Sequence, residues 1–228
     1  MPPGTKRPRG RPPLPEDNAT RERLLEAARK LFSRKSFTQV SIRDITEEAG
    51  LGVAAVHYHF GSKNGLVLAL FRRTAPAVIE QRLALLAAAT ARTGSIEERL
   101  DGVLYALLAP VIRWSREPEA QRYYIPFLMR AQLDGPRRIQ ELDNRNIRHL
   151  GPFREALQNL LPEMSEAEIG WRLHFVLGIE HAVMMEAQRM SKLTGGASDE
   201  EDDETVIRRV VEFARQGWLC AATSGRTS

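Results

Sequence analysis

The sequence is poor in cysteine and has no long apolar run. Its 228 residues include one cysteine, Cys220, which excludes a disulfide within the chain and a zinc site built from several cysteines. The longest apolar run, LALLAAA at 83–89, is far shorter than the roughly 20 residues that cross a bilayer. The charged N-terminus lacks the apolar stretch of a secretory signal. We therefore expect a cytoplasmic protein with no membrane partner.

Motifs for catalysis and metal binding are also missing. Neither Glu-x-x-His nor His-Glu-x-x-His occurs, which excludes the di-iron bundle and the zinc-protease site. His57 and His59 are two residues apart on a predicted helix, so they point away from each other and cannot share a metal. GLGVAA at 50–55 fits a dinucleotide fingerprint, but no strand precedes it and no acid follows before Glu80. We expect no enzymatic activity, no cofactor and no metal.

The charge is distributed unevenly along the chain. Residues 1–13 contain four basic residues and no acid, and residues 14–73 contain ten basic and seven acidic residues. Residues 74–228 contain 19 basic and 22 acidic residues. Such a distribution predicts a polyanion-binding head on a body with another role.

Apolar residues recur at helical spacing throughout, and no period-two alternation marks a strand, so the predicted fold class is all-α. We expect a basic arm at 1–17, a DNA-binding head at 18–73 and a helical body at 74–228. Thr20 is the predicted N-cap of the first helix, and Pro76 is expected to kink or break a long helix that starts at residue 63. Further helices are predicted over roughly 95–115, 165–193 and up to about 222.

The stretch SIRDITEEAGLGVAAVHYHFGSKNGL at 41–66 predicts a helix-turn-helix. Ser41 is an N-cap for a helix over 42–49, and Gly50 suits the left-handed residue that ends it. A second short helix spans 53–60. With the first helix closing the shared core, the second helix is free to enter a major groove.

This stretch resembles the TetR (tetracycline-repressor-like) family of bacterial transcription regulators. The resemblance rests on ITEEAGLG at 45–52 and VHYHFGSKNGL at 56–66, and it covers roughly residues 20–71. Thr46 replaces the usual alanine, Gly52 a serine or threonine, His57 the usual tyrosine and Asn64 an acidic residue. These departures mean that no operator sequence can be transferred from a relative.

The resemblance implies that one set of side chains contacts the DNA bases and another set contacts the sugar-phosphate backbone of the DNA. Those facing bases are Val53, Ala54, Ala55, His57 and Tyr58, and those facing sugar-phosphate are Ser41, Arg43, His59 and Lys63. Small residues at the start of the helix allow close approach to thymine methyl groups, and Lys63 at a helix N-terminus suits a phosphate. Core packing is the alternative role for Tyr58.

The N-terminal RPRGRPP at 7–13 has the form of an AT-hook. In such a hook Arg9, Gly10 and Arg11 lie in a narrow minor groove, because glycine adds no bulk and the guanidinium groups seek negative potential. The alternative is a solvated basic tail.

For the body, the resemblance implies a ligand-binding and dimerisation domain. Trp171 and Phe175 on one helix, and Phe213 among two apolar stripes on the last helix, fit paired helices between subunits, although an ordinary core is the alternative. Candidates for the lining of an apolar effector pocket, each of which also suits plain core, are Tyr105, Trp114, Tyr123, Tyr124, Phe127, His174, His181 and Met184. Arg113, Arg122 and Arg172 are candidate partners of a carboxylate or phosphate.

Together these features predict a homodimeric, ligand-responsive regulator, more often a repressor than an activator, whose partners are a double-stranded DNA operator and a small apolar effector. Two alternatives stay open. One is a non-specific architectural protein of the minor groove, and the other is a helical small-molecule-binding protein with an incidental basic head.

Overall fold

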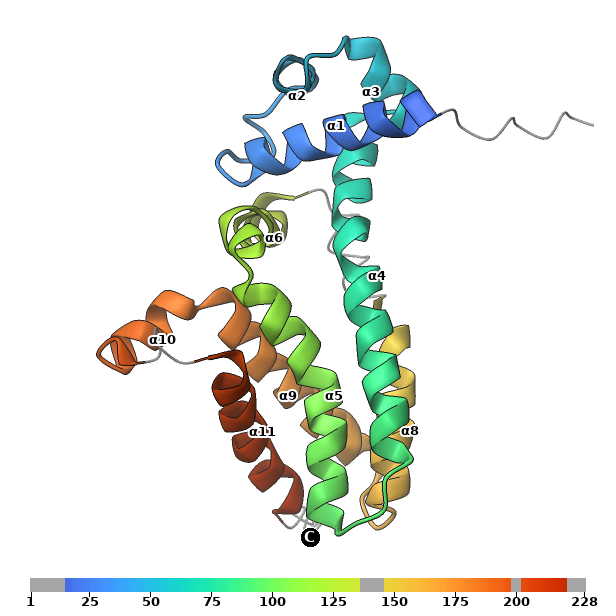
Figure 1. Ribbon diagram of the computed structural model, residues 1–228, viewed down its shortest axis with the longest axis vertical. Coiled ribbons are helices and arrows are strands. Elements are labelled where there is room, and N and C mark those ends of the chain that lie inside the picture. The colour runs from blue at the N-terminus through green and yellow to red at the C-terminus, as the bar shows by residue number, and fades with distance from the viewer. Residues whose placement is uncertain (1–14, 136–145, 198–201, 221–228) are drawn as a thin grey trace, which may run out of the picture.

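The computed structural model describes residues 15–135, 146–197 and 202–220, and within these ranges the chain contains helices and no strand. This confirms the all-α prediction. In chain order the elements are α1 (Pro15–Phe32), α2 (Ile42–Ala49), α3 (Val53–Phe60), α4 (Lys63–Thr90), α5 (Ile96–Arg116), the π-helical turn η1 (Ala120–Tyr124), α6 (Ile125–Asp134), the 3-10 turn η2 (Asn146–Leu150), α8 (Gly151–Leu160), α9 (Glu166–Met185), α10 (Ala187–Leu193) and α11 (Asp203–Leu219). The helix α4 joins the head, formed by α1 to α3, to the body (Figure 1).

Contacts between residues close in sequence set the bounds of the two short helices of the helix-turn-helix. The Ser41 hydroxyl accepts a hydrogen bond from the Asp44 backbone N–H at 3.1 Å, and the Asp44 carboxylate accepts one from the Ser41 N–H at 2.7 Å. Gly50 ends α2 with φ of 62°, a left-handed conformation that favours glycine. Both short helices have the predicted bounds, because caps and stops specify them locally.

Three predicted helix boundaries differ from the structure. α1 begins at Pro15 instead of Thr20, since proline is well tolerated in a first turn, where its missing N–H has no partner to lose. α4 runs from Lys63 to Thr90 as one helix with Pro76 inside it, so of the kink or break expected there the break does not occur. The helix predicted over 165–193 is divided at Glu186 into α9 and α10, without a proline or glycine to mark the division.

The body is a bundle in which α5 is the central helix. α4, α8, α9 and α11 all pack against α5, whose fully buried residues include Leu100, Leu104 and Leu107. The outer faces of α9 and α11 leave large aromatic side chains in solvent, with Trp171 and Phe175 each 59% exposed and Phe213 72% exposed. No helix in the described ranges has the length and apolarity needed to cross a membrane.

The hydrophobic core of the head extends beyond the predicted head segment. Besides residues of α1 to α4, it contains Phe127 and Ala131 of α6. The Phe127 ring lies 6.5 Å from that of Phe32 and 5.9 Å from that of Phe37, which themselves stack at 4.6 Å between centroids. Phe127 is fully buried there and packs the core of the head, which is the plain-core role that was the alternative for this residue.

Candidate nucleic-acid interface and effector body

The outer face of α3 carries most of the predicted base-reading side chains. Val53 is 43% exposed, Tyr58 is 76% exposed, and Ala54 and His57 are also exposed. Val56 is fully buried beneath them and anchors the helix to the core of the head. The exposure of Tyr58 excludes the core role for this ring. α3 therefore presents small side chains near its start and polar rings near its end, as a helix that enters a major groove would require.

Two of the predicted DNA-facing residues lie closer to the head than expected. Ala55 is half-buried against the head core. The His59 side chain is only 8% exposed, its Nε2 lies 3.5 Å from a carboxylate oxygen of Asp17, and its ring is perpendicular to that of Tyr58. The geometry therefore does not support a phosphate contact for His59. Instead, His59 ties α3 to α1 and supports the exposed Tyr58 ring.

Among the predicted phosphate-binding residues, one has no ion pair with a described residue, and two already form hydrogen bonds within the head. Arg43 is exposed and forms no ion pair within the described ranges. Ser41 is exposed, but its hydroxyl donates to the Asp44 carboxylate at 2.7 Å. The Lys63 ammonium donates to the backbone carbonyls of Phe37 and, at 2.8 Å, Val40. The first task of Lys63 is thus to hold the loop before α2 against the start of α4.

Arginine side chains hold the turn and the end of α1 in a way that the sequence did not indicate. Arg23 of α1 donates to the carbonyl oxygens of Ala49 at 2.6 Å and Gly50 at 3.4 Å, which are otherwise open at the end of α2. Arg130 of α6 donates to the Ser33 carbonyl oxygen at 2.8 Å. Arg23 is 26 residues from Ala49, and Arg130 is 97 residues from Ser33, so no local motif could predict these contacts.

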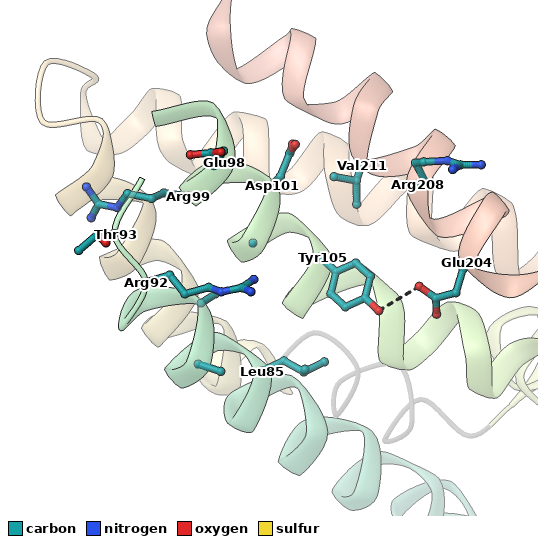
Figure 2. A pocket seen from close by; sticks show the side chains of 13 residues that line it. Leu85, Arg92, Thr93, Glu98, Arg99, Asp101, Tyr105, Glu204, Arg208 and Val211 are labelled. Atoms are coloured by element: carbon teal, nitrogen blue, oxygen red, sulfur yellow. Dashed lines mark hydrogen bonds between the residues drawn. The ribbon is translucent and has the colours of Figure 1, made fainter. Parts of the chain in front are cut away.

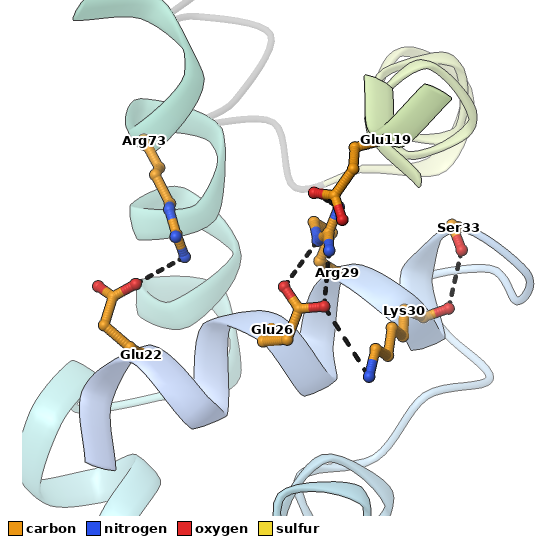
Figure 3. Close-up of polar contacts among 7 residues, drawn as sticks. All are labelled: Glu22, Glu26, Arg29, Lys30, Ser33, Arg73 and Glu119. Atoms are coloured by element: carbon orange, nitrogen blue, oxygen red, sulfur yellow. Dashed lines mark hydrogen bonds and ion pairs between the residues drawn. The ribbon is translucent and has the colours of Figure 1, made fainter. Parts of the chain in front are cut away.

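A buried guanidinium joins the head to the body (Figure 3). Arg29 of α1 is 4% exposed, forms two hydrogen bonds with Glu26 at 2.6 and 2.9 Å, and donates to Glu119 at 3.2 Å just before η1. Its guanidinium carbon lies 4.2 Å from the ring centre of Tyr123 and 5.1 Å from that of Tyr124. The hydrogen bond from Arg29 lowers the pKa of Glu26, so the pair stays ionised at neutral pH.

A second buried guanidinium joins α4 to the rest of the body. Arg82, 5% exposed, donates from Nε to the Leu107 carbonyl oxygen at 2.7 Å, lies 3.2 Å from Nε2 of His149, and pairs with Glu180 of α9. Burial raises the pKa of Glu180. One side chain thus connects the long helix that supports the head to three other elements of the body.

The predicted effector-lining residues do not gather around one pocket in the structure. Tyr105 lines a groove between α4, α5 and α11. Tyr123 and Tyr124 pack on Arg29, and the Trp114 ring lies 6.0 Å from that of Tyr124. On α9, His174 and His181 are exposed, and Met184 is half-buried. The arginines suggested as anion partners include two engaged side chains, since Arg113 bonds Glu204 and Arg172 donates to three carbonyl oxygens at the end of α11.

The remaining site predictions concern the N-terminal arm and metal binding. The AT-hook residues Arg9, Gly10 and Arg11 lie outside the described residues. In the described ranges, no group of three histidine, cysteine, aspartate or glutamate side chains is arranged to hold a metal ion.

Comparison with known proteins identifies both parts of the chain. Residues 24–70 match the model of bacterial regulatory proteins of the tetR family, and residues 105–217 match that of the tetracyclin repressor-like C-terminal domain. The HTH-type transcriptional repressor AcnR of Corynebacterium glutamicum is 34% identical over 61 residues, which are 27% of this chain and 32% of that protein. The AcnR protein of Corynebacterium efficiens matches to the same extent. The chain thus matches about a third of the length of these relatives.

Solved structures share the whole fold at low sequence identity. NalD of Pseudomonas aeruginosa, the secondary repressor of the MexAB-OprM multidrug efflux pump, has a TM-score of 0.61 at 19% identity, with 88% of this chain and 97% of NalD covered. The fatty acid degradation regulator FadR of Bacillus halodurans has a TM-score of 0.56 at 13% identity, with 89% and 97% covered.

Proposed function

Because the chain belongs to the TetR family of DNA-binding transcription regulators, which are not enzymes, we propose that it is a repressor that binds a pseudo-palindromic operator as a homodimer. The observation that carries this proposal is the exposed face of α3, with Tyr58 76% exposed above a buried Val56. A tyrosine on the outer face of such a helix offers a rigid ring and a hydroxyl that can contact base edges. AcnR and NalD are both named as repressors, which supports repression of transcription over activation.

Sequence reading is assigned to α3 and affinity to the surrounding cations. Tyr58 and His57 contact base edges, and Val53 and Ala54 contact thymine methyl groups. Arg43, at the start of α2, contacts the phosphate backbone without needing to break an ion pair. The arm with Arg9, Gly10 and Arg11 adds minor-groove contacts and a preference for A·T pairs. The protein acts in the bacterial cytoplasm, where the operator lies.

The homodimer is proposed to form through the outer faces of α9 and α11. Trp171, Phe175 and Phe213 form an exposed aromatic surface of the kind that marks a protein interface. A two-fold axis there pairs two heads with two half-sites about 34 Å apart, one helical turn of DNA.

Release from DNA is proposed to follow the binding of a small effector in the body. Arg82 and Arg29 supply the mechanical connection, because one joins α4 to α5 and α9 and the other joins α1 to the segment before η1. An effector that favours one arrangement of the body then changes the spacing of the heads.

The test is selection of bound duplexes from genomic fragments, followed by anisotropy titrations at several salt concentrations. Replacing Tyr58 or His57 by alanine is expected to change sequence preference, each at about 1–3 kcal/mol for the preferred site. Arg43→Ala is expected to weaken all duplexes equally and to reduce the salt slope by about 0.9. Arg43 is a better probe of phosphate binding than Lys63, whose replacement would also release the loop before α2.

The alternatives predict different results in the same titrations. Equal losses on all sequences from Tyr58→Ala, His57→Ala and Arg43→Ala would contradict sequence reading by α3 and favour an architectural protein. Absence of salt-dependent binding to any duplex would favour a small-molecule-binding protein. Deletion of residues 1–13 tests the arm separately, because only lost phosphate contacts reduce both affinity and salt slope.

A further inference from the structure

A groove of about 950 Å³ lies between the end of α4, the start of α5 and the first half of α11 (Figure 2). Its volume is within the range of small-molecule sites, roughly 300–1,000 Å³. Apolar and small residues from all three helices line part of it, namely Leu85, Ala88, Ala89, Gly102 and Val211. α4 and α5 approach closely along this line, since a Cβ added at Gly102 would lie 3.2 Å from the Ala89 Cβ.

The acidic side chains that line the groove already have partners. The Glu98 carboxylate accepts from the Ser95 backbone N–H at 2.9 Å. Asp101 pairs with Arg215 at 2.6 Å, and Glu204 accepts from Arg113 at 2.9 Å and from the Tyr105 hydroxyl at 3.0 Å. The hydrogen bond from Arg113 lowers the pKa of Glu204, so this carboxylate stays ionised and committed to that pair.

The basic side chains that line the groove are not neutralised in this way. Arg92, Arg99 and Arg208 are all exposed, and none of them forms an ion pair with the residues that the structure describes. Arg92 extends from the end of α4 toward Tyr105, across the groove, whereas Arg99 lies beside Thr93 at its edge (Figure 2). Since Asp101 and Glu204 are paired with arginines, three lining guanidinium groups face one lining carboxylate that no cation in the described ranges balances, that of Glu98, so the groove carries net positive charge beside an apolar wall.

We propose that this groove binds an amphipathic organic anion, whose carboxylate, sulfonate or phosphate pairs with Arg92 and whose apolar part lies on Leu85, Ala88 and Val211. A guanidinium forms paired, charge-assisted hydrogen bonds with such groups, and it needs to break no existing ion pair to do so. The groove joins α4, which supports the head, to α11 of the proposed dimer surface. The proposal therefore specifies that the effector is an anion. It rests on the proposed function only for the statement that binding in this groove changes binding to DNA.

The probe for binding is the fluorescent dye 1-anilinonaphthalene-8-sulfonate, with N-phenyl-1-naphthylamine as its counterpart without the sulfonate. Both are titrated into the full chain without DNA. Arg92→Gln is expected to weaken binding of the sulfonate about tenfold, the effect of one charge-assisted pair, and to leave binding of the neutral dye within about twofold. Arg154→Gln, an exposed arginine of α8 outside the groove, is the matched control and is expected to change neither dye.

A second variant tests the apolar wall. Ala88 is exposed on α4, so Ala88→Trp fits without disturbing the core and is expected to abolish the Arg92-dependent part of the binding. Equal affinity of the sulfonate for the wild type and Arg92→Gln would overturn the proposal. Because the titration contains no DNA, its failure removes only the groove as a site, whereas failure to bind any duplex removes only the regulator.

Discussion

In the head, the hydrogen bonds that set where α2 and α4 begin join neighbours, as Ser41 with Asp44 and Ser62 with Gly65, each three residues apart. In the body, the polar contacts join helices across long stretches of chain: Arg113 and Glu204 are 91 residues apart, and Arg82 and Glu180 are 98. The starts of these helices therefore follow from the local sequence, whereas the packing of the head also needs the distant contacts of Arg23 and Lys63, and the helices of the body are joined by contacts of that distant kind. Under the proposed function, short-range caps suit the unit that presents one geometry to DNA, and long-range contacts suit the unit that responds to an effector.

The distinction between the head and the body does not hold at Phe127, a residue of α6 that is buried in the core of the head. Phe127→Ala is expected to destabilise the head by about 3–5 kcal/mol, because it leaves a cavity beside Phe32 and Phe37. Urea unfolding followed by circular dichroism, together with duplex binding, measures the effect. Met129→Ala on the same helix is the control, since Met129 is 42% exposed. Equal losses from both variants would show that Phe127 does not support the head.

The proposed dimer surface belongs to the body alone, and this separation can be tested. Trp171→Glu is expected to raise the dissociation constant of the dimer about a hundredfold, because a charge replaces a large aromatic side chain at the interface. Sedimentation equilibrium measures the dimer, and the helical signal is expected to persist. Leu193→Glu, at a position of α10 that is 79% exposed, is the control. An unchanged dimer in Trp171→Glu would place the interface elsewhere.

The joint between head and body gives a smaller effect. Arg29→Met keeps the apolar stem but leaves Glu26, among the described residues, with only its longer ion pair to Lys30, at 3.9 Å, and it is expected to cost about 2 kcal/mol of stability. Glu119→Gln, at a carboxylate that is 73% exposed, is expected to cost less than about 0.5 kcal/mol. Thermal unfolding of both variants measures the two contributions. A large loss in Glu119→Gln would mean that the link to the body, and not the pair within α1, holds Arg29 in place.

The smallest effect concerns a local cap of the head. The Ser41 N–H and hydroxyl lower the pKa of Asp44, so the ionised carboxylate stabilises the fold above its usual pKa of 3.8. This contribution is lost as the pH falls through the lowered pKa of the folded state. Asp44→Ala is therefore expected to reduce Tm by a few degrees at pH 7, with the difference from wild type disappearing in acid. A constant difference across this range of pH would contradict the cap.

The same contrast explains what could be predicted from the sequence. The bounds of α2 and α3 and the left-handed Gly50 followed from motifs whose partners are a few residues apart, and the exposure of Tyr58 agrees with what the family resemblance implied. The roles of Arg23, Lys63 and Arg82 did not, because each depends on a carbonyl or carboxylate far along the chain. The place of His59 was also missed, since only the course of α1 brings Asp17 beside it. Prediction failed where a residue's partner is set by tertiary structure.

The burial of Phe127 in the head core bears on how such a protein can change over generations. Recombination that exchanged the first 73 residues between two relatives would part Phe32 and Phe37 from the ring that completes their packing. The hybrid would bind DNA well only if the new body offered an aromatic side chain of similar shape at the matching position of α6. Under the proposed function, DNA specificity and effector specificity are therefore inherited together more readily than they are exchanged separately, even though each depends on a different part of the molecule.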